Sequence, residues 1–238
     1  MALAMAITVS GSAIFPIIAS AKSVDNHGTK IEESTNKSTK LTQQEKEYLF
    51  NWFDTYGVNK ETQKNLMNKL KNGQKWDCLN SENPHKDVVN QSYTKQVFDD
   101  GSICITGVDL SNAKIVENKD VVTPTAVDPG QVSSGSGYIS YRGAKVYQYF
   151  GIINASFNAD FYLSKGGSGI DKVENKKVLV VGGSASNVAL SIDRAQEAYD
   201  PARATLSFET AAYNGGTGAN CWLSLYVGNG TYYSNYSF

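Results

Sequence analysis

The sequence predicts a mainly β protein in which an N-terminal helical hairpin precedes a C-terminal antiparallel β-sandwich or small barrel. From residue 138 onward, apolar and polar residues alternate one by one, which is the pattern of strands with one buried face. Before residue 80, apolar residues instead recur at the spacing of a helix face. Turns rich in glycine and asparagine divide the C-terminal part into about seven strands, a number typical of sandwiches and small barrels.

The composition limits the possible classes of function. The chain has 238 residues, 41% of them hydrophobic, and a formal net charge of −1. This length and apolar content suffice for one or two globular domains. Because Lys and Arg are not in excess, the chain lacks the positive charge that neutralises phosphates, so no nucleic-acid partner is expected. No motif indicates a cofactor, and none is expected.

Residues 1–21 are predicted to be a signal peptide. The segment carries no charge before Lys22, and Ala19-Ser20-Ala21 has the form of a cleavage site after an apolar stretch. We therefore expect a secreted, extracellular protein. The polar residues 22–40 follow as a predicted flexible tail, because they contain too few apolar side chains to form a core. Whether this tail is removed stays open.

Residues 41–80 are predicted to form a helical hairpin. Thr42 and Glu45 have the spacing of a capping box at the start of the first helix, and Asn59 is a favourable N-cap for the second. The first helix carries a stripe of mostly aromatic residues that we expect to pack on a neighbouring domain. This stripe consists of Tyr48, Leu49, Trp52, Phe53 and Tyr56.

The next boundaries follow changes in composition. Residues 81–122 form a predicted β-hairpin region, with the turn signal Asp99-Asp100-Gly101 between two strands. Residues 123–136 are rich in Pro, Gly, Ser and Thr and are predicted to be a linker. Residues 137–238 are the predicted β-sandwich domain. Its strands are expected to bury the odd positions of 153–163, the even positions of 202–208 and the odd positions of 221–227.

The stretch KKVLVVGGSASNVALSI (176–192) resembles the opening of a dinucleotide-binding fold. The fingerprint needs glycine at positions that are here Ser184 and Asn187, and a side chain at these positions prevents close approach to a pyrophosphate. The preceding residues also alternate as antiparallel strands. We therefore predict two strands, 178–181 and 187–192, around a turn, without a nucleotide site.

Residues suited to nucleophilic or redox catalysis are scarce. The two histidines, His27 and His85, both lie outside the predicted β domain, which disfavours a Ser-His-Asp site or a histidine zinc site there. Cys78, Cys104 and Cys221 permit at most one intramolecular disulfide, and the sequence does not choose the pair. Acidic residues of the predicted β domain are possible acid–base groups, although no spacing marks a catalytic pair. They are Asp160, Asp171, Glu174, Asp193, Glu197, Asp200 and Glu209, of which Asp160 and Glu209 are the first to test by substitution.

Tyrosine is the most distinctive component, with 14 residues. Its ring offers a large contact area and its hydroxyl a hydrogen bond, so outward-facing tyrosines suit ligand binding. Aromatic residues also suit half-buried sheet surfaces without any ligand, and both interpretations stay open. The candidate binding residues are Tyr138, Tyr141, Tyr147, Tyr149, Tyr162, Trp222, Tyr226, Tyr232, Tyr233 and Tyr236.

The segment YGVNKETQKNLMNKLKNGQKWDCLN (56–80), placed between a signal segment and a glycine- and aromatic-rich β domain, resembles uncharacterised small secreted proteins of Gram-positive bacteria. The resemblance implies export and the order of the domains. It implies no catalytic residues.

Three functions are compatible with these features. The first is an exported non-enzymatic protein whose aromatic-rich β domain binds a cell-envelope or extracellular ligand, either a cell-wall glycan or an extracellular protein, with a membrane surface as a further possible partner. The second is a small secreted pore-forming toxin or bacteriocin-like antimicrobial protein, because amphipathic strands can insert as a barrel after oligomerisation. The third is a carboxylate-dependent glycan hydrolase.

Overall fold

The computed structural model describes residues 41–80, 82–89, 93–117, 138–211 and 218–238. All of these residues belong to one compact unit. The predicted signal peptide (1–21), tail (22–40) and linker (123–136) lie outside the described residues.

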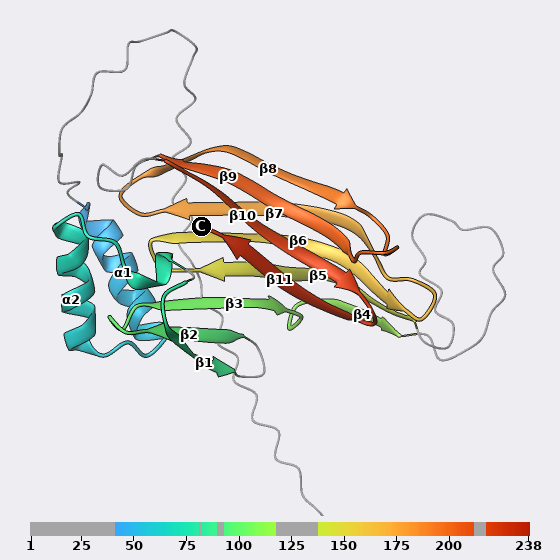
Figure 1. Ribbon diagram of the computed structural model, residues 1–238, viewed down its shortest axis with the longest axis horizontal. Coiled ribbons are helices and arrows are strands. Elements are labelled where there is room, and N and C mark those ends of the chain that lie inside the picture. The colour runs from blue at the N-terminus through green and yellow to red at the C-terminus, as the bar shows by residue number, and fades with distance from the viewer. Residues whose placement is uncertain (1–40, 81, 90–92, 118–137, 212–217) are drawn as a thin grey trace, which may run out of the picture. The chain divides into compact units, whose positions relative to one another are not determined.

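Two helices precede the strands, as predicted, and a short 3₁₀ turn that was not predicted follows them (Figure 1). They are α1 (Gln43–Thr55), α2 (Lys60–Lys71) and η1 (Asp77–Leu79). The strands of the N-terminal half are β1 (His85–Val89), β2 (Thr94–Phe98), β3 (Ile103–Asp109) and β4 (Lys114–Glu117). Those that follow are β5 (Tyr138–Tyr149), β6 (Ile153–Ser164), β7 (Gly169–Val180), β8 (Ser184–Arg194), β9 (Ala202–Ala211), β10 (Ala219–Gly228) and β11 (Thr231–Ser237).

The described strands form two antiparallel sheets. Sheet A has the order β1-β2-β3-β5-β6-β7, with β4 also paired to β5, and sheet B has the order β11-β10-β9-β8. The sheets pack face to face with open edges. The structure is therefore a sandwich, and the small barrel that the sequence also allowed is not formed.

The alternation of residues in β9 and β10 builds the interface between the sheets. Ala204, Leu206, Leu223 and Leu225 are fully buried, and in register Leu206 lies opposite Leu223. Phe157 of sheet A is equally buried in the same core. Each buried leucine or phenylalanine side chain contributes about 1.5–3 kcal/mol by removing apolar surface from water. The residues between them point to the outer face of sheet B.

The glycine stretch forms the crossing from sheet A to sheet B. β7 and β8 are two strands around a turn, as predicted, but they pair with β6 and β9 rather than with each other. Gly182 in the turn has a φ of 74°, which glycine adopts without strain. Its N–H donates to the Glu45 carboxylate at 2.9 Å. Glu45 also completes the capping box with Thr42, so one side chain joins the start of α1 to the crossing.

Sheet A joins strands from both sides of residues 118–137. β2 and β3 turn at Asp99–Gly101, where the sequence predicts a hairpin, and β3 pairs directly with β5. β1 and β4 were not predicted. Both are short and lie next to a single partner strand, so their sequences show little of the alternation that marks the central strands.

The helices dock on sheet A through aromatic residues of α1. The Trp52 ring lies over Gly151, where a Cβ atom would come within 2.9 Å of it. Asn154 donates from Nδ2 to the Tyr48 hydroxyl at 3.0 Å. The aromatic stripe of α1 therefore packs on sheet A, which agrees with its predicted role in packing.

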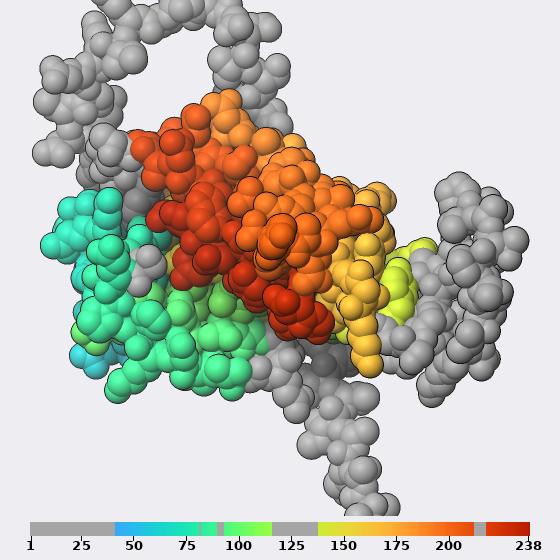
Figure 2. Space-filling model, turned by 45° about the vertical axis from the view of Figure 1, so that its right-hand side comes forward, coloured from blue at the N-terminus to red at the C-terminus, as the bar shows by residue number. Residues whose placement is uncertain are grey.

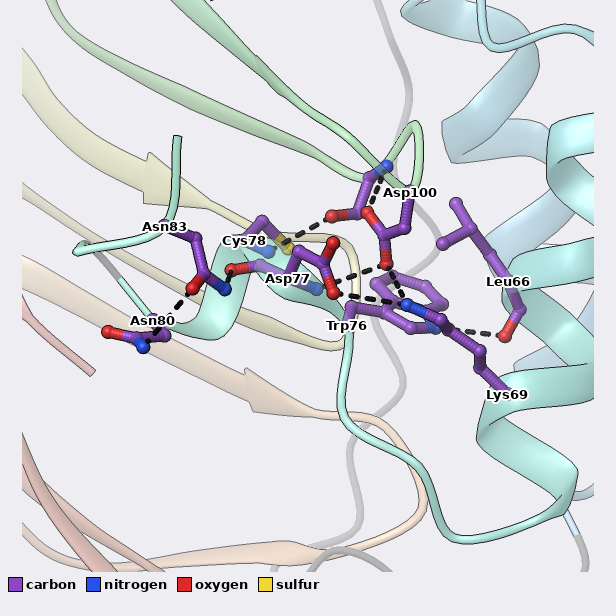
Figure 3. A network of polar contacts seen from close by, with 9 residues as sticks. Leu66, Lys69, Trp76, Asp77, Cys78, Asn80, Asn83 and Asp100 are labelled. Carbon is purple, nitrogen blue, oxygen red and sulfur yellow. Dashed lines mark hydrogen bonds and ion pairs between the residues drawn. The ribbon is translucent and has the colours of Figure 1, made fainter. Parts of the chain in front are cut away.

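A second attachment of the helices is an ionic network (Figure 3). Lys69 of α2 donates to Asp100 at 2.8 Å and to Asp77 at 3.1 Å. Asp100 also accepts the backbone N–H groups of Asp77 and Ser102. Burial alone would raise the pKa of Asp100, but these hydrogen bonds, led by that from Lys69, hold it below its ordinary value. The network therefore fixes α2 and η1 to the β2–β3 turn with an ionised carboxylate.

We predict that Asp100→Ala lowers the free energy of unfolding by about 3 kcal/mol. The change leaves the Asp77 and Ser102 N–H groups without their acceptor and removes one of the two carboxylates that pair with Lys69. Urea denaturation measures the change. Asp99→Ala is the matched control, since the neighbouring Asp99 is exposed. Equal stability of the two variants would contradict the role given to the network.

Candidate functional site

The outer face of sheet B is a polar surface built by the residues that alternate with the core. Side chains directly opposite each other on neighbouring strands share a face. One row across the sheet contains Arg203, Tyr226 and Tyr233, and the next contains Thr205, Ser224 and Asn235. Figure 2 shows the strands of this sheet, coloured orange to red, as a continuous surface toward the viewer.

Three of the predicted aromatic residues lie on this face. Tyr226 and Tyr233 stack with a centroid distance of 4.9 Å and an interplanar angle of 6°. Tyr233 is 49% exposed. Trp222 lies in a third row between Ser207 and Ser237 and is half-buried. The face therefore carries two aromatic positions separated along β10.

A charged group lies beside the tyrosine pair. Asp193 of β8 accepts hydrogen bonds from Arg203 at 2.9 Å and from Thr205 at 2.6 Å. Thr205 has one hydroxyl proton, so it accepts rather than donates in its 2.8 Å contact with Ser224. Burial would raise the pKa of Asp193, but the hydrogen bonds from Thr205, Ser191 and Arg203 lower it overall. This carboxylate is ionised at neutral pH and is unsuited to act as a general acid.

Three of the other predicted residues lie between the sheets. Tyr141 stacks on Phe161 at 4.9 Å and contacts Tyr232 at 5.8 Å. Tyr236 donates to Gln96 at 3.0 Å, and burial raises its pKa. These side chains contribute to packing between the sheets, because the register of β11 turns Tyr232 and Tyr236 to the inner face.

The remaining four lie on the outer face of sheet A. Tyr147 and Tyr149 stack at 5.0 Å close to the helices, and Tyr147 is only 6% exposed. Tyr138 and Tyr162 stack at 5.3 Å. The ten residues are thus divided among several places, and only Trp222, Tyr226 and Tyr233 share an open face of sheet B.

The acidic residues considered for catalysis are also separated. Asp160 belongs to sheet A and accepts the Gly143 N–H at 2.7 Å, whereas Glu209 lies on the outer face of sheet B. The structure instead brings Asp160 near Asp171. Partial burial raises the pKa of Asp171, the negative charge of Asp160 raises it further, and Arg142 opposes the shift.

The described residues provide neither a cysteine with a lowered pKa nor a cluster of metal ligands. Cys78, Cys104 and Cys221 are buried free thiols, and burial raises the pKa of each. No group of three or more His, Cys, Asp or Glu side chains in this part of the chain is arranged to hold a metal ion.

A hollow of about 460 Å³ lies between α2 and the β2–β3 turn. Its lining includes Lys69 and Asp100, whose charges already serve the network that attaches α2. None of the ten predicted aromatic residues lines it. The hollow is therefore a weaker candidate for the site than the outer face of sheet B.

Several residues near the candidate site were not predicted from the sequence to be binding residues. Asp193, Arg203 and Thr205 form its charged group, and their only sequence signal is their polar alternation with buried neighbours. Tyr199, in the β8–β9 loop, is the most exposed of the large apolar residues described. It follows a turn-like polar segment and precedes Asp200-Pro201, which is a loop signal.

Comparison with solved structures shows similarity to a bacterial protein. The chain is similar to a hypothetical protein, lmo2686, from the Gram-positive bacterium Listeria monocytogenes EGD-e, known from a 2.75 Å crystal structure. The two share 20% sequence identity, and the match covers 69% of this chain and 100% of the other, with a TM-score of 0.35. No protein-family profile and no curated protein matches the chain. Among the described residues, no helix is both long and apolar enough to cross a membrane.

We predict opposite titration behaviour for two aspartates. Asp193 should titrate below the ordinary value of 3.8 and Asp171 above it. The stabilisation from Asp193 is therefore present above its unfolded pKa and lost as the pH falls through its folded pKa, whereas acidification relieves the cost of ionising Asp171. Carboxyl ¹³C chemical shifts followed from pH 7 to pH 2 measure both midpoints. The reverse order of midpoints would contradict the described hydrogen bonds.

Proposed function

We propose that this chain is an exported protein that binds a glycan of the cell envelope through the outer face of sheet B. The observation that carries the proposal is the position of Trp222, Tyr226 and Tyr233 on one open face. The exposed polar side chains of Ser207, Asn235 and Ser237 lie on the same face. Export and the relation to small secreted proteins of Gram-positive bacteria rest on the sequence of residues 1–21 and 56–80.

The chemistry of the face suits sugars. An aromatic ring packs against the C–H groups of a sugar ring, and the Tyr hydroxyl can hydrogen-bond at the rim. The exposed side chains of Ser207, Asn235 and Ser237 offer donors and acceptors to sugar hydroxyls. Arg203 is held by Asp193 and by a hydrogen bond to Tyr226, which together raise its pKa and fix its position. The site is therefore largely formed before a ligand arrives.

A glycan fits this face better than a protein partner does. The centre of a protein interface is usually apolar and depleted of charge. Here the aromatic positions are separated by the Thr205–Ser224 row and flanked by the Arg203–Asp193 ion pair. Sugars, which alternate apolar and hydroxyl-bearing surfaces, match this alternation.

A carboxylate-dependent glycan hydrolase is the second candidate, because Asp160 and Asp171 are close and the pKa of Asp171 is raised. A carboxyl group with a raised pKa beside a second carboxyl group is typical of acid–base catalysis. The pair lies on the outer face of sheet A, away from the aromatic positions of sheet B. Hydrolysis and binding can therefore be tested with separate variants.

We predict that the protein sediments with isolated Gram-positive peptidoglycan and that Trp222→Ala and Tyr233→Ala each weaken binding about tenfold, equivalent to about 1.4 kcal/mol. Removal of a ring from the face deletes a stacking contact in either case. Tyr138→Ala is the matched control, since its ring lies on the outer face of sheet A. Thermal melting verifies that each variant is folded.

Two results would contradict the proposal, and a third would support the second candidate function. Equal binding by the wild type and the two sheet B variants would show that the outer face of sheet B is not the binding surface. Association with liposomes accompanied by calcein release, without binding to the wall, would favour the toxin. Release of soluble sugars that is abolished by Asp160→Asn or Asp171→Asn would favour the hydrolase.

A further inference from the structure

Tyr199 projects from the β8–β9 loop into solvent. Its relative exposure is 107%, so the neighbouring residues cover none of the side chain. Single exposed apolar residues are common on protein surfaces and need no explanation by themselves. The loop that presents Tyr199, however, is held in place on several sides.

The Glu197 side chain fastens this loop to two other turns. Its carboxylate accepts the Asn229 N–H of the β10–β11 turn at 2.6 Å and the Ser168 N–H of the β6–β7 turn at 2.9 Å. These two hydrogen bonds hold the pKa of Glu197 below its ordinary value of 4.5, so the carboxylate is ionised at neutral pH. The loop is thus joined to both sheets.

Further contacts fix the two ends of the loop. The Ile170 N–H donates to the Ala195 carbonyl, and the Glu197 N–H donates to the Ser168 carbonyl, both at 2.8 Å. At the other end, Arg194 pairs with Asp200 at 3.1 Å. A contact residue on a loop held in this way has lost much of its freedom before binding, which lowers the entropic cost of association.

The loop continues the candidate face of sheet B. It begins directly after Arg194, which lies opposite Arg203 in the row of the tyrosine pair. Gly228, two residues after Tyr226, lies against Pro201 and Glu197, where a Cβ atom would come within 3.1 Å of Pro201. The loop that carries Tyr199 therefore lies at the C-terminal end of β10, which is also the end nearer to Tyr226.

The aromatic positions follow the direction of β10. Trp222 and Tyr226 are four residues apart on one strand, which corresponds to about 13 Å. A single sugar ring does not span this distance. Tyr199 adds an aromatic group beyond Tyr226, at the end of the same strand.

We infer that the ligand is an extended glycan of several sugars and that Tyr199 is an additional binding residue for the part of the glycan that passes beyond the C-terminal end of β10. This inference rests on the proposed function. It identifies the ligand class as a linear polymer rather than a monosaccharide or disaccharide.

Glycan strands released from Gram-positive peptidoglycan by an amidase and fractionated by length are the probe. Isothermal titration calorimetry compares the wild type, Tyr199→Ala and Tyr233→Ala. The affinity of the wild type should rise with strand length until the strand reaches Tyr199. Tyr199→Ala should weaken binding of long strands at least fivefold and leave the shortest bound strands unchanged, whereas Tyr233→Ala should weaken all of them.

Two further variants separate the loop from the rest of the surface. Glu197→Ala removes the fastening carboxylate and keeps the Tyr199 ring, so it should also weaken binding of long strands only. Phe50→Ala removes an exposed ring of α1 and should have no effect at any length.

The inference would be overturned if Tyr199→Ala bound strands of every length like the wild type while Tyr233→Ala was impaired. An affinity of the wild type that did not depend on strand length would overturn it as well. In both cases the proposed glycan-binding function would still hold. Absence of binding by the wild type to strands of any length contradicts the proposed function itself and is distinguishable from these results.

Discussion

Sheet B packs on sheet A through the inner faces of β9 and β10, and the arrangement of the remaining residues depends on this contact. Every second residue in the middle of these two strands is buried in the core. These residues are Ala204, Leu206, Leu223 and Leu225, and none has exposed surface. The residues between them must then lie on the outer face, because successive side chains of a strand point to opposite sides. The alternation that stabilises the sandwich thereby also assembles the aromatic and hydroxyl rows of the candidate site.

The same contact requires the chain to cross between the sheets, and the crossing determines what surrounds the site. Gly182 allows the turn after β7 to leave sheet A, and Glu45 binds that turn to α1. The helices dock on sheet A, through Trp52 and Tyr48, and leave the outer face of sheet B uncovered by the described helices. At the opposite end of the strands, Glu197 links the turns of both sheets and supports the loop of Tyr199. A stable core and an accessible, preformed surface are therefore consequences of one topology.

Local patterns in the sequence were sufficient to predict much of this fold. The capping box at Thr42, the N-cap at Asn59 and the buried positions of β6, β9 and β10 agree with the structure, because each depends on neighbouring residues only. The division of strands between two sheets depends on long-range pairing and could not be predicted. For the same reason the sequence did not separate Tyr141, Tyr232 and Tyr236, which face the core, from Trp222, Tyr226 and Tyr233. Tyr199 was missed because its loop is held by contacts of Glu197 with residues about 30 positions away in either direction.

Backbone amide NMR spectra recorded during titration with soluble cell-wall glycan strands test the central claim most directly, because they locate the ligand without any mutation. The shifts should concentrate at the outward positions of β8–β11, around Trp222, Tyr226 and Tyr233, and extend to Tyr199 with long glycan strands. Outward positions of β5–β7 should remain unchanged. Shifts confined to the outer face of sheet A, or no shifts at saturating glycan, would contradict the assignment of sheet B as the binding surface.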